Sequence, residues 1–177
     1  IIVDVQNDFC GGGSLAVTNG PPITVPINEL VEQFRVAGST IVATQDWHPA
    51  THSSFASMND TIPFTVLKKS DGTEQMMWTD HCVQGTDGAE FHPNITRAIQ
   101  SSHMIVRKGY NVNVDSYSAF RENDKVTVTG LAGFLKDRGV KRCFFVGLAL
   151  DYCVKYSAMD AIDFGFESVI VKSMTRS

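Results

Sequence analysis

The sequence predicts an α/β fold with an open, mostly parallel sheet and helices on both faces, a Rossmann-like three-layer sandwich. Apolar runs of strand length alternate along the chain with segments whose apolar residues recur at helical spacing. The connections between successive strands suit right-handed crossovers. Residues capable of catalysis follow several of these strands, which is where ligands bind in sheets of this kind.

The first half of the chain supplies two strands and a helix. Residues 1–5 and 39–44 are apolar runs of strand length. Between them, four apolar residues trace one face of a helix. We expect Thr24 to cap the start of this helix and Gly38 to end it.

The second half continues the alternation of strands and helices. Glycines follow two of the predicted helices, where they favour helix termination. We expect a short helix over 93–100, a strand over 103–107, a helix over 131–138, a strand over 143–146, a helix that opens near Cys153, and a strand over 168–171.

Three segments between these elements are predicted to be loops: QNDFCGGG (6–13), DWHPATHSSF (46–55) and DSYSAF (115–120). The glycines of the first do not fit the spacing of a dinucleotide fingerprint or a P-loop. Residues 56–80 are expected to be irregular and polar, with KKSDGTEQ forming an exposed turn.

Composition and length describe an ordinary globular chain. Its 177 residues fit one domain, 1–177, and we expect that domain to lack its natural start and a final covering helix. The net charge of −4 favours neither nucleic acid nor an anionic membrane as partner. Four cysteines without a CxxC pattern suit a reducing compartment, so we expect a cytoplasmic protein.

Cys153 is the candidate nucleophile. A thiol in the first turn of a helix faces the positive end of the helix dipole, which lowers the pKa of the thiol and favours the thiolate. The alternative is a small core residue, because cysteines in apolar surroundings often only pack.

Four chemically capable residues follow four different predicted strands. Asp4 ends the first strand, Asp46 and Lys108 follow the second and third, and Cys153 lies in the turn after the fourth. Parallel strands end at one edge of a sheet, so we expect these side chains to meet. Taken singly, Asp4 could cap a loop and Lys108 could be solvated.

Together, the four residues suggest hydrolysis of an amide through a thioester. Asp4 can accept the thiol proton and Lys108 can hold the resulting charges. Cys153 can then attack a carbonyl carbon while backbone N–H groups of the turn at 148–153 stabilise the oxyanion.

A group of histidines predicts a metal site. Asp46, His48 and His52 fall within seven positions, and His81 follows in WTDHCVQGT. Their nitrogen and oxygen donors suit one divalent ion, zinc first, with iron or manganese as alternatives. The other interpretation is a set of surface histidines. Nearby, Trp78 is either a core residue or a wall for a flat ligand.

Six motifs span nearly the whole chain: IIVDVQNDFCGGGSLAV, TQDWHPATHSSF, WTDHCVQGTDGAEFHP, KG, DSYSAF and GLALDYCVKYSAMDA. Together they resemble the nicotinamidase/pyrazinamidase group of the isochorismatase-like hydrolases. The resemblance implies a catalytic triad of Asp4, Lys108 and Cys153. It also implies a metal bound by Asp46, His48, His52 and His81, with waters completing its shell.

The same resemblance implies the walls of a substrate pocket. Leu148–Ala149 matches the family's cis peptide, whose surroundings supply oxyanion donors from Ala149 and Cys153. The implied substrate contacts are Phe9, Trp78, Tyr117, Leu148, Ala149 and Tyr152. Tyr152 stands where many members carry histidine, and segment 56–80 is longer than in compact bacterial members.

The activity implied is hydrolysis of nicotinamide to nicotinate and ammonia in NAD salvage, with pyrazinamide as a second substrate. Assembly into a homo-oligomer is left open. A related cysteine hydrolase acting on an N-carbamoyl compound or another amide is the nearest alternative, although its relatives resemble the triad and lack the metal site. Isochorismate hydrolysis fits less well because it does not require the cysteine. A metal-binding interaction protein without catalysis is the alternative from another class.

Overall fold

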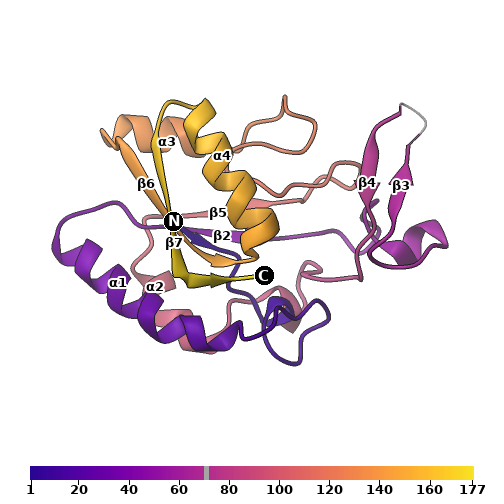
Figure 1. The fold of residues 1–177 in the computed structure, drawn as a ribbon, viewed down its shortest axis with the longest axis horizontal. Coiled ribbons are helices and arrows are strands. Elements are labelled where there is room, and N and C mark those ends of the chain that lie inside the picture. Colours follow the sequence, from indigo (N-terminus) through magenta and orange to yellow (C-terminus); the bar gives the residue numbers. More distant parts are fainter. Residues whose placement is uncertain (70–71) are drawn as a thin grey trace.

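A five-stranded parallel sheet forms the centre of the computed structural model, which describes residues 1–69 and 72–177 (Figure 1). Its strand order is β5-β2-β1-β6-β7. The strands are β1 (Ile2–Val3), β2 (Val42–Asp46), β5 (Met104–Lys108), β6 (Arg142–Leu148) and β7 (Glu167–Arg176). The chain builds outward from β1 on one side and then returns to add β6 and β7 on the other. The switch point therefore lies between β1 and β6, where open sheets of this kind bind ligands.

Helices cover both faces of the sheet, and the predicted fold class is confirmed. Figure 1 shows α1 (Thr24–Val36) and α2 (Thr96–Gln100) on one face, with α3 (Leu131–Asp137) and α4 (Lys155–Asp163) on the other. Alternation along β1 explains the two cores. Ile2 packs into the core beneath α1, whereas its neighbour Val3 packs into the core beneath α4.

Short helical turns occupy several connections. Among the described residues, five of these turns are 3-10 helices: Asn7–Phe9, Pro21–Ile23, Ala56–Asn59, Asp87–Ala89 and Pro93–Ile95. A sixth, Leu150–Val154, is a π-helix. Within the described residues, no helix is both long enough and apolar enough to cross a membrane.

The predicted helix start was wrong in detail. Thr24 does not cap α1, because the 3-10 turn Pro21–Ile23 runs directly into the helix. The hydroxyl of Thr24 instead donates to the carbonyl of Pro21 at 2.8 Å.

The ends of all five strands were also misplaced. β1 ends at Val3, two residues early, and β7 continues to Arg176, five residues beyond its predicted end. β2 and β5 continue to Asp46 and Lys108, the candidate residues that were expected just after them. β6 continues through Gly147, where the sequence suggested a turn. Gly147 has φ 114° and a Cβ there would collide with the carbonyl of Val3, so the glycine serves close approach to β1.

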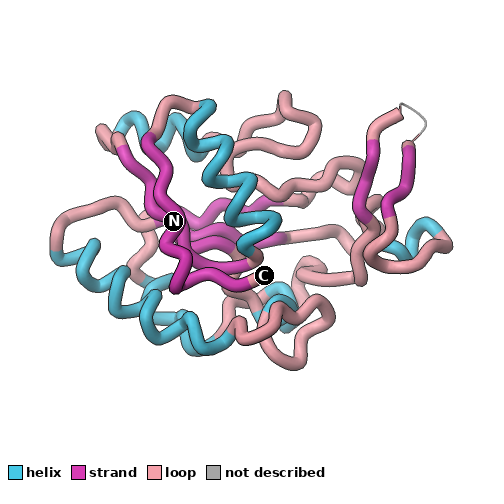
Figure 2. The backbone as a smooth tube through the Cα atoms, in the orientation of Figure 1, coloured by secondary structure: helices cyan, strands magenta, loops and turns pink. Residues whose placement is uncertain are grey.

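Segment 56–80 contains a β-hairpin, so the prediction of an irregular segment was wrong. β3 (Val66–Lys68) and β4 (Glu74–Met76) pair antiparallel and project away from the main sheet (Figure 2). Strands of three residues are too short to show a periodic pattern, so they are recognisable only from their pairing. The predicted turn in KKSDGTEQ includes residues 70 and 71, which lie outside the described residues.

Candidate active site

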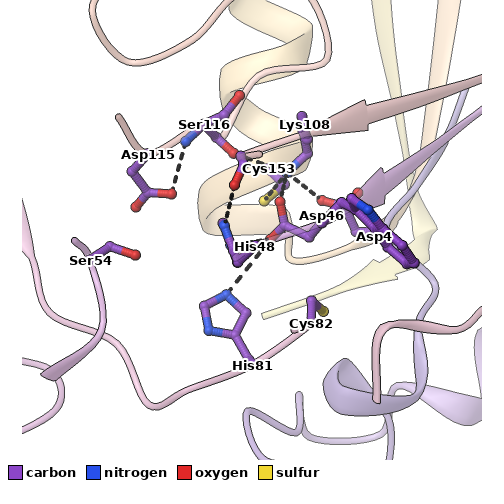
Figure 3. A network of polar contacts seen from close by, with 12 residues as sticks. Asp4, Asp46, His48, Ser54, His81, Cys82, Lys108, Asp115, Ser116 and Cys153 are labelled. Atoms are coloured by element: carbon purple, nitrogen blue, oxygen red, sulfur yellow. Dashed lines mark hydrogen bonds and ion pairs between the residues drawn. The ribbon is translucent and has the colours of Figure 1, made fainter. Parts of the chain in front are cut away.

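The carboxyl edge of the sheet gathers the four predicted residues into one buried network (Figure 3). Lys108 lies at its centre and is fully buried, which excludes the solvated alternative. Its Nζ lies 2.8 Å from Asp4 Oδ2 and 2.7 Å from Asp46 Oδ1. It also donates to Cys153 Sγ at 3.4 Å and to the carbonyl of Ser116 at 3.0 Å. One lysine thus contacts both carboxylates and the thiol.

The charges in this network stabilise one another. Burial opposes the charged form of Lys108, but Asp4 and Asp46 outweigh it and raise the pKa of the lysine well above its usual range. Burial likewise opposes ionisation of Asp46. Lys108 and His48 prevail there and hold the pKa of Asp46 well below its usual range. The ammonium and the Asp46 carboxylate are therefore both charged at neutral pH.

Asp4 and Cys153 behave differently. Burial raises the pKa of Asp4 despite the nearby lysine, and Asp46 adds to this effect. Burial also raises the pKa of Cys153 well above its usual range; Lys108 opposes this, but Asp4 and Asp46 reinforce it. The predicted lowering of the pKa of Cys153 at a helix start is therefore wrong. A thiol of this kind needs a base beside it to become a nucleophile.

Asp4 is held in place by Thr44, a residue that the sequence did not single out. The Thr44 hydroxyl donates to Asp4 Oδ1 at 2.6 Å, and the backbone N–H of Asp4 donates to the same hydroxyl at 3.2 Å. Asp4 has φ 45°, in the left-handed region that non-glycine residues seldom adopt. Thr44 lies two residues before Asp46, so strand periodicity alone places both on one face of β2.

Three of the four predicted metal ligands converge beside this network. Donor atoms of Asp46, His48 and His81 lie within 4.8 Å of one another, and all three residues are buried. The Nε2 atoms of His48 and His81 lie 3.4 and 3.7 Å from Asp46 Oδ2.

Backbone carbonyls orient both imidazoles of this group. His48 Nδ1 lies 2.8 Å from the carbonyl of Gly109, and His81 Nδ1 lies 2.7 Å from that of Thr79. Carbonyl oxygens only accept, so Nδ1 donates in each ring, and Nε2, which faces Asp46, is the nitrogen left to bind a metal. Metal-binding histidines are held in this way in proteins. The residues present therefore fit a divalent ion.

His52 does not join this group. Its Nδ1 lies 2.7 Å from Ser54 Oγ and its Nε2 lies 3.3 Å from the carbonyl of Val114. Its ring centre lies 4.3 Å from that of His48, in a neighbouring cluster with Asp115. The structure thus places His52 behind His48, where it packs against a candidate ligand.

A cavity of about 390 Å³ opens beside Cys153. Its walls are mainly apolar and aromatic, as in sites for flat organic ligands. The predicted site residues that line it are Phe9, Asp46, Trp78, His81, Tyr117, Ala149, Tyr152 and Cys153. Trp78 meets Tyr152 edge-on with ring centres 4.8 Å apart, and Tyr117 at 6.3 Å.

Leu148 was predicted to contact the substrate, but the structure places it elsewhere. Its side chain is fully buried in the core beneath α1 and does not line the cavity. The bond between Leu148 and Ala149 is cis. The π-helix Leu150–Val154 follows and presents Cys153 to the cavity; π-helical turns often occur at functional sites.

Comparison with known proteins identifies the family. The model of the isochorismatase domain matches residues 1–177. The chain belongs to the isochorismatase domain family. This result confirms the resemblance predicted from the motifs.

Relatives of this isochorismatase domain include characterised enzymes. It is 46% identical to the nicotinamidase of Acinetobacter baylyi over 172 residues, which cover 97% of this chain and 77% of the relative. It is 40% identical to the Escherichia coli nicotinamidase over 171 residues, 97% of this chain and 79% of the relative.

Solved structures support the same grouping. A nicotinamidase/pyrazinamidase of Acinetobacter baumanii superimposes with a TM-score of 0.93 at 42% identity, covering 99% of this chain and 82% of its own. The Pyrococcus horikoshii pyrazinamidase, solved in complex with zinc, gives 0.79 at 34% identity, with 99% and 84% covered.

Several residues of the isochorismatase domain site escaped sequence reasoning. Leu15, Val17, Phe64 and Met76 line the cavity beside the predicted residues. Leu15 and Val17 fall in the first motif, which could have indicated them. Phe64 and Met76 lie in segment 56–80, where no periodicity or motif distinguished them.

Proposed function

We propose that this isochorismatase domain hydrolyses nicotinamide to nicotinate and ammonia for NAD salvage, and that it also deamidates pyrazinamide. The observation that carries the proposal is the contact of Lys108 with Asp4 and Cys153 at the wall of an aromatic cavity. A cavity of this shape suits a single flat ring that carries a carboxamide. The identity to two nicotinamidases supports the choice of substrate.

The first half of the reaction forms a thioester. Asp4 takes the proton of the Cys153 thiol, and the thiolate attacks the carboxamide carbon. The resulting oxyanion is stabilised by backbone N–H groups of Ala149 and Cys153. Asp4 then returns the proton to the nitrogen, the C–N bond breaks, and ammonia leaves. Lys108 remains charged throughout and balances the negative charge that moves between Asp4 and the sulfur.

The second half hydrolyses the thioester. Asp4 removes a proton from a water molecule as its oxygen attacks the acyl carbon, and the C–S bond breaks. The proton returns to Cys153, and nicotinate leaves the cavity. The same acid–base residue thus serves both halves.

The metal proposed for Asp46, His48 and His81 is zinc, since two imidazoles and a carboxylate suit it and the Pyrococcus relative holds it. When bound, a divalent ion supplies a Lewis acid beside the cavity. Asp46 and His81 both line that cavity. Asp46 also contacts Lys108, so it links the proposed metal group to the triad. His52 supports the orientation of His48 in this proposal.

An assay of ammonia release from nicotinamide and pyrazinamide, with metal analysis of the same sample, tests this function. We expect turnover of both amides and about one equivalent of zinc per chain. Release of ammonia only from an N-carbamoyl compound would favour the sister hydrolases instead. Bound zinc without turnover of any amide would contradict an enzymatic role.

A further inference from the structure

Phe64 occupies an unusual position at the outer end of the active-site cavity. It lines this cavity together with Cys153, yet 62% of its surface is exposed. Its ring meets the buried Trp78 edge-on, with centres 6.1 Å apart. An exposed phenylalanine contributes little to folding through burial, so packing in the fold does not account for its place.

The backbone of Phe64 is also unusual. Its φ is 65°, in the left-handed region that a bulky aromatic residue rarely adopts. Two hydrogen bonds at the base of the β3–β4 hairpin hold it there. The N–H of Phe64 donates to the carbonyl of Met77 at 2.7 Å, and the N–H of Met77 donates to the carbonyl of Thr65 at 2.8 Å. Such conformations persist where surrounding structure enforces them, and they concentrate at functional sites.

The cavity itself needs an outer wall. Its volume of about 390 Å³ lies within the range for drug-sized ligands, and a single heteroaromatic ring fills only part of it. Phe9 and Trp78, which are buried, and Tyr117, which is half-buried, form part of its wall. Phe64, just before β3, and Met76, in β4, supply further apolar surface, and Phe64 is the more exposed of the two.

We propose that Phe64 is a further substrate-contacting residue that covers the outer edge of a bound heteroaromatic amide. This inference rests on the proposed function. When a flat ring enters, the exposed face of Phe64 loses contact with water, and that burial adds to affinity. The left-handed backbone directs the Cα–Cβ bond, and the edge-on contact with Trp78 holds the ring beside the cavity before the ligand arrives.

Calorimetric titration of nicotinamide into the zinc-loaded Cys153→Ala chain tests the inference, because binding is then measured without turnover. Adding Phe64→Gly should raise the Kd about five-fold, the effect of losing burial of roughly half a phenylalanine side chain. Glycine accepts a positive φ without strain, so the Tm should rise by about 2–4 °C. If Phe64 served only to stabilise the fold, its replacement by glycine would lower the Tm instead.

Ile62 provides the matched control. It lies two residues earlier, is 72% exposed and does not line the cavity, so Ile62→Ala should leave the Kd unchanged. Phe64→Leu keeps an apolar side chain, so its Kd should lie between those of the parent and of Phe64→Gly. An unchanged Kd in Phe64→Gly, or a higher Kd accompanied by a lower Tm, would overturn the inference. A parent chain that does not bind nicotinamide would refute the proposed function itself.

Discussion

The carboxyl edge of the sheet and the β3–β4 hairpin contribute to one cavity by opposite means. At the edge, Asp4, Asp46 and Lys108 are almost completely buried, and Lys108 contacts the two carboxylates at 2.8 and 2.7 Å. On the hairpin arm, meaning β3, β4 and the residues that lead into β3, Phe64 and Val66 expose 62% and 55% of their surfaces. Charges withdrawn from water interact strongly and tolerate little change, whereas an exposed apolar surface changes energy only when a ligand covers it.

In this account the buried edge carries the chemistry, whereas the exposed arm contributes to recognition of the ligand. Substitutions at the edge should remove turnover or the fold, because each buried charge there depends on its partner. Substitutions on the arm should change affinity by small factors and leave the chemistry in place. The following predictions test that division, from the largest expected effect to the smallest.

Cys153→Ala should give the largest loss, at least about 10⁴-fold in ammonia release, because the proposed bond-forming atom is removed. Zinc content and Tm should stay close to those of the parent. Cys143→Ala is the matched control, since Cys143 is also a buried free thiol but lies outside the cavity. Steady-state assays of both variants would refute the covalent mechanism if Cys153→Ala retained activity.

Lys108→Met should abolish turnover and also destabilise the chain by about 3–5 kcal/mol, because it leaves Asp4 and Asp46 without their buried cation. Denaturant titration measures the loss. Lys141→Met changes the same residue type at an exposed position and should be almost neutral. Equal stability of the two variants would show that the edge does not depend on its central charge.

Gly109→Ala should weaken zinc binding by about 10- to 100-fold, as changes around metal ligands commonly do. A Cβ at Gly109 would meet His48 Cε1 and displace the ring. Gly38→Ala is the control. The φ of Gly38 is 71°, close to the 66° of Gly109, but a Cβ at Gly38 would meet no atom within 4 Å. Competition with a chelator measures both affinities. Similar affinities in both variants would argue against His48 as a ligand.

Glu122→Gln should produce the smallest effect, visible only in the pH dependence of stability. Glu122 is 2% exposed, and burial raises its pKa to about 7 from the ordinary value of 4.5. Between these values the unfolded chain loses the proton while the folded chain keeps it, so this residue lowers stability as pH rises to about 7.

The glutamine variant avoids that loss. Its Tm should match the parent near pH 4.5 and exceed it by at least about 2 °C above pH 7. Thermal unfolding across this range provides the measurement. A constant difference between the two chains at every pH would contradict the assignment.

Much of the edge was predictable because parallel strands end together. Asp4, Lys108 and Cys153 each follow a recognisable apolar strand, so topology alone placed them at one edge. Their protonation was not predictable. The helix start at Cys153 suggested a low pKa, but burial of the thiol raises that pKa, and the carboxylates that add to the effect come from distant strands and reach the thiol only after folding.

The proposed metal ligands show how far spacing along the chain can predict a site. Asp46 and His48 lie two residues apart and face one way, as extended backbone dictates. His52 was assigned to the same group by its proximity in the chain. The backbone N–H of His52, however, donates to the carbonyl of Pro49 at 3.0 Å, and this turn directs its ring toward Ser54.

The arm was predicted least well, since its structure comes from pairing between short segments. Neither β3 nor β4 carries a strand pattern strong enough to stand alone. Phe64 therefore looked like a residue of an irregular insert. The role that we propose for it rests on its edge-on contact with Trp78 and on its backbone angle, which only the structure shows.

The thioester on Cys153 is the central claim, and partitioning of the acyl group between water and hydroxylamine tests it most directly. If ammonia leaves before the second nucleophile attacks, the ratio of nicotinohydroxamate to nicotinate should rise linearly with hydroxylamine, and ammonia release should not fall. Formation of nicotinate alone at every hydroxylamine concentration would contradict the account.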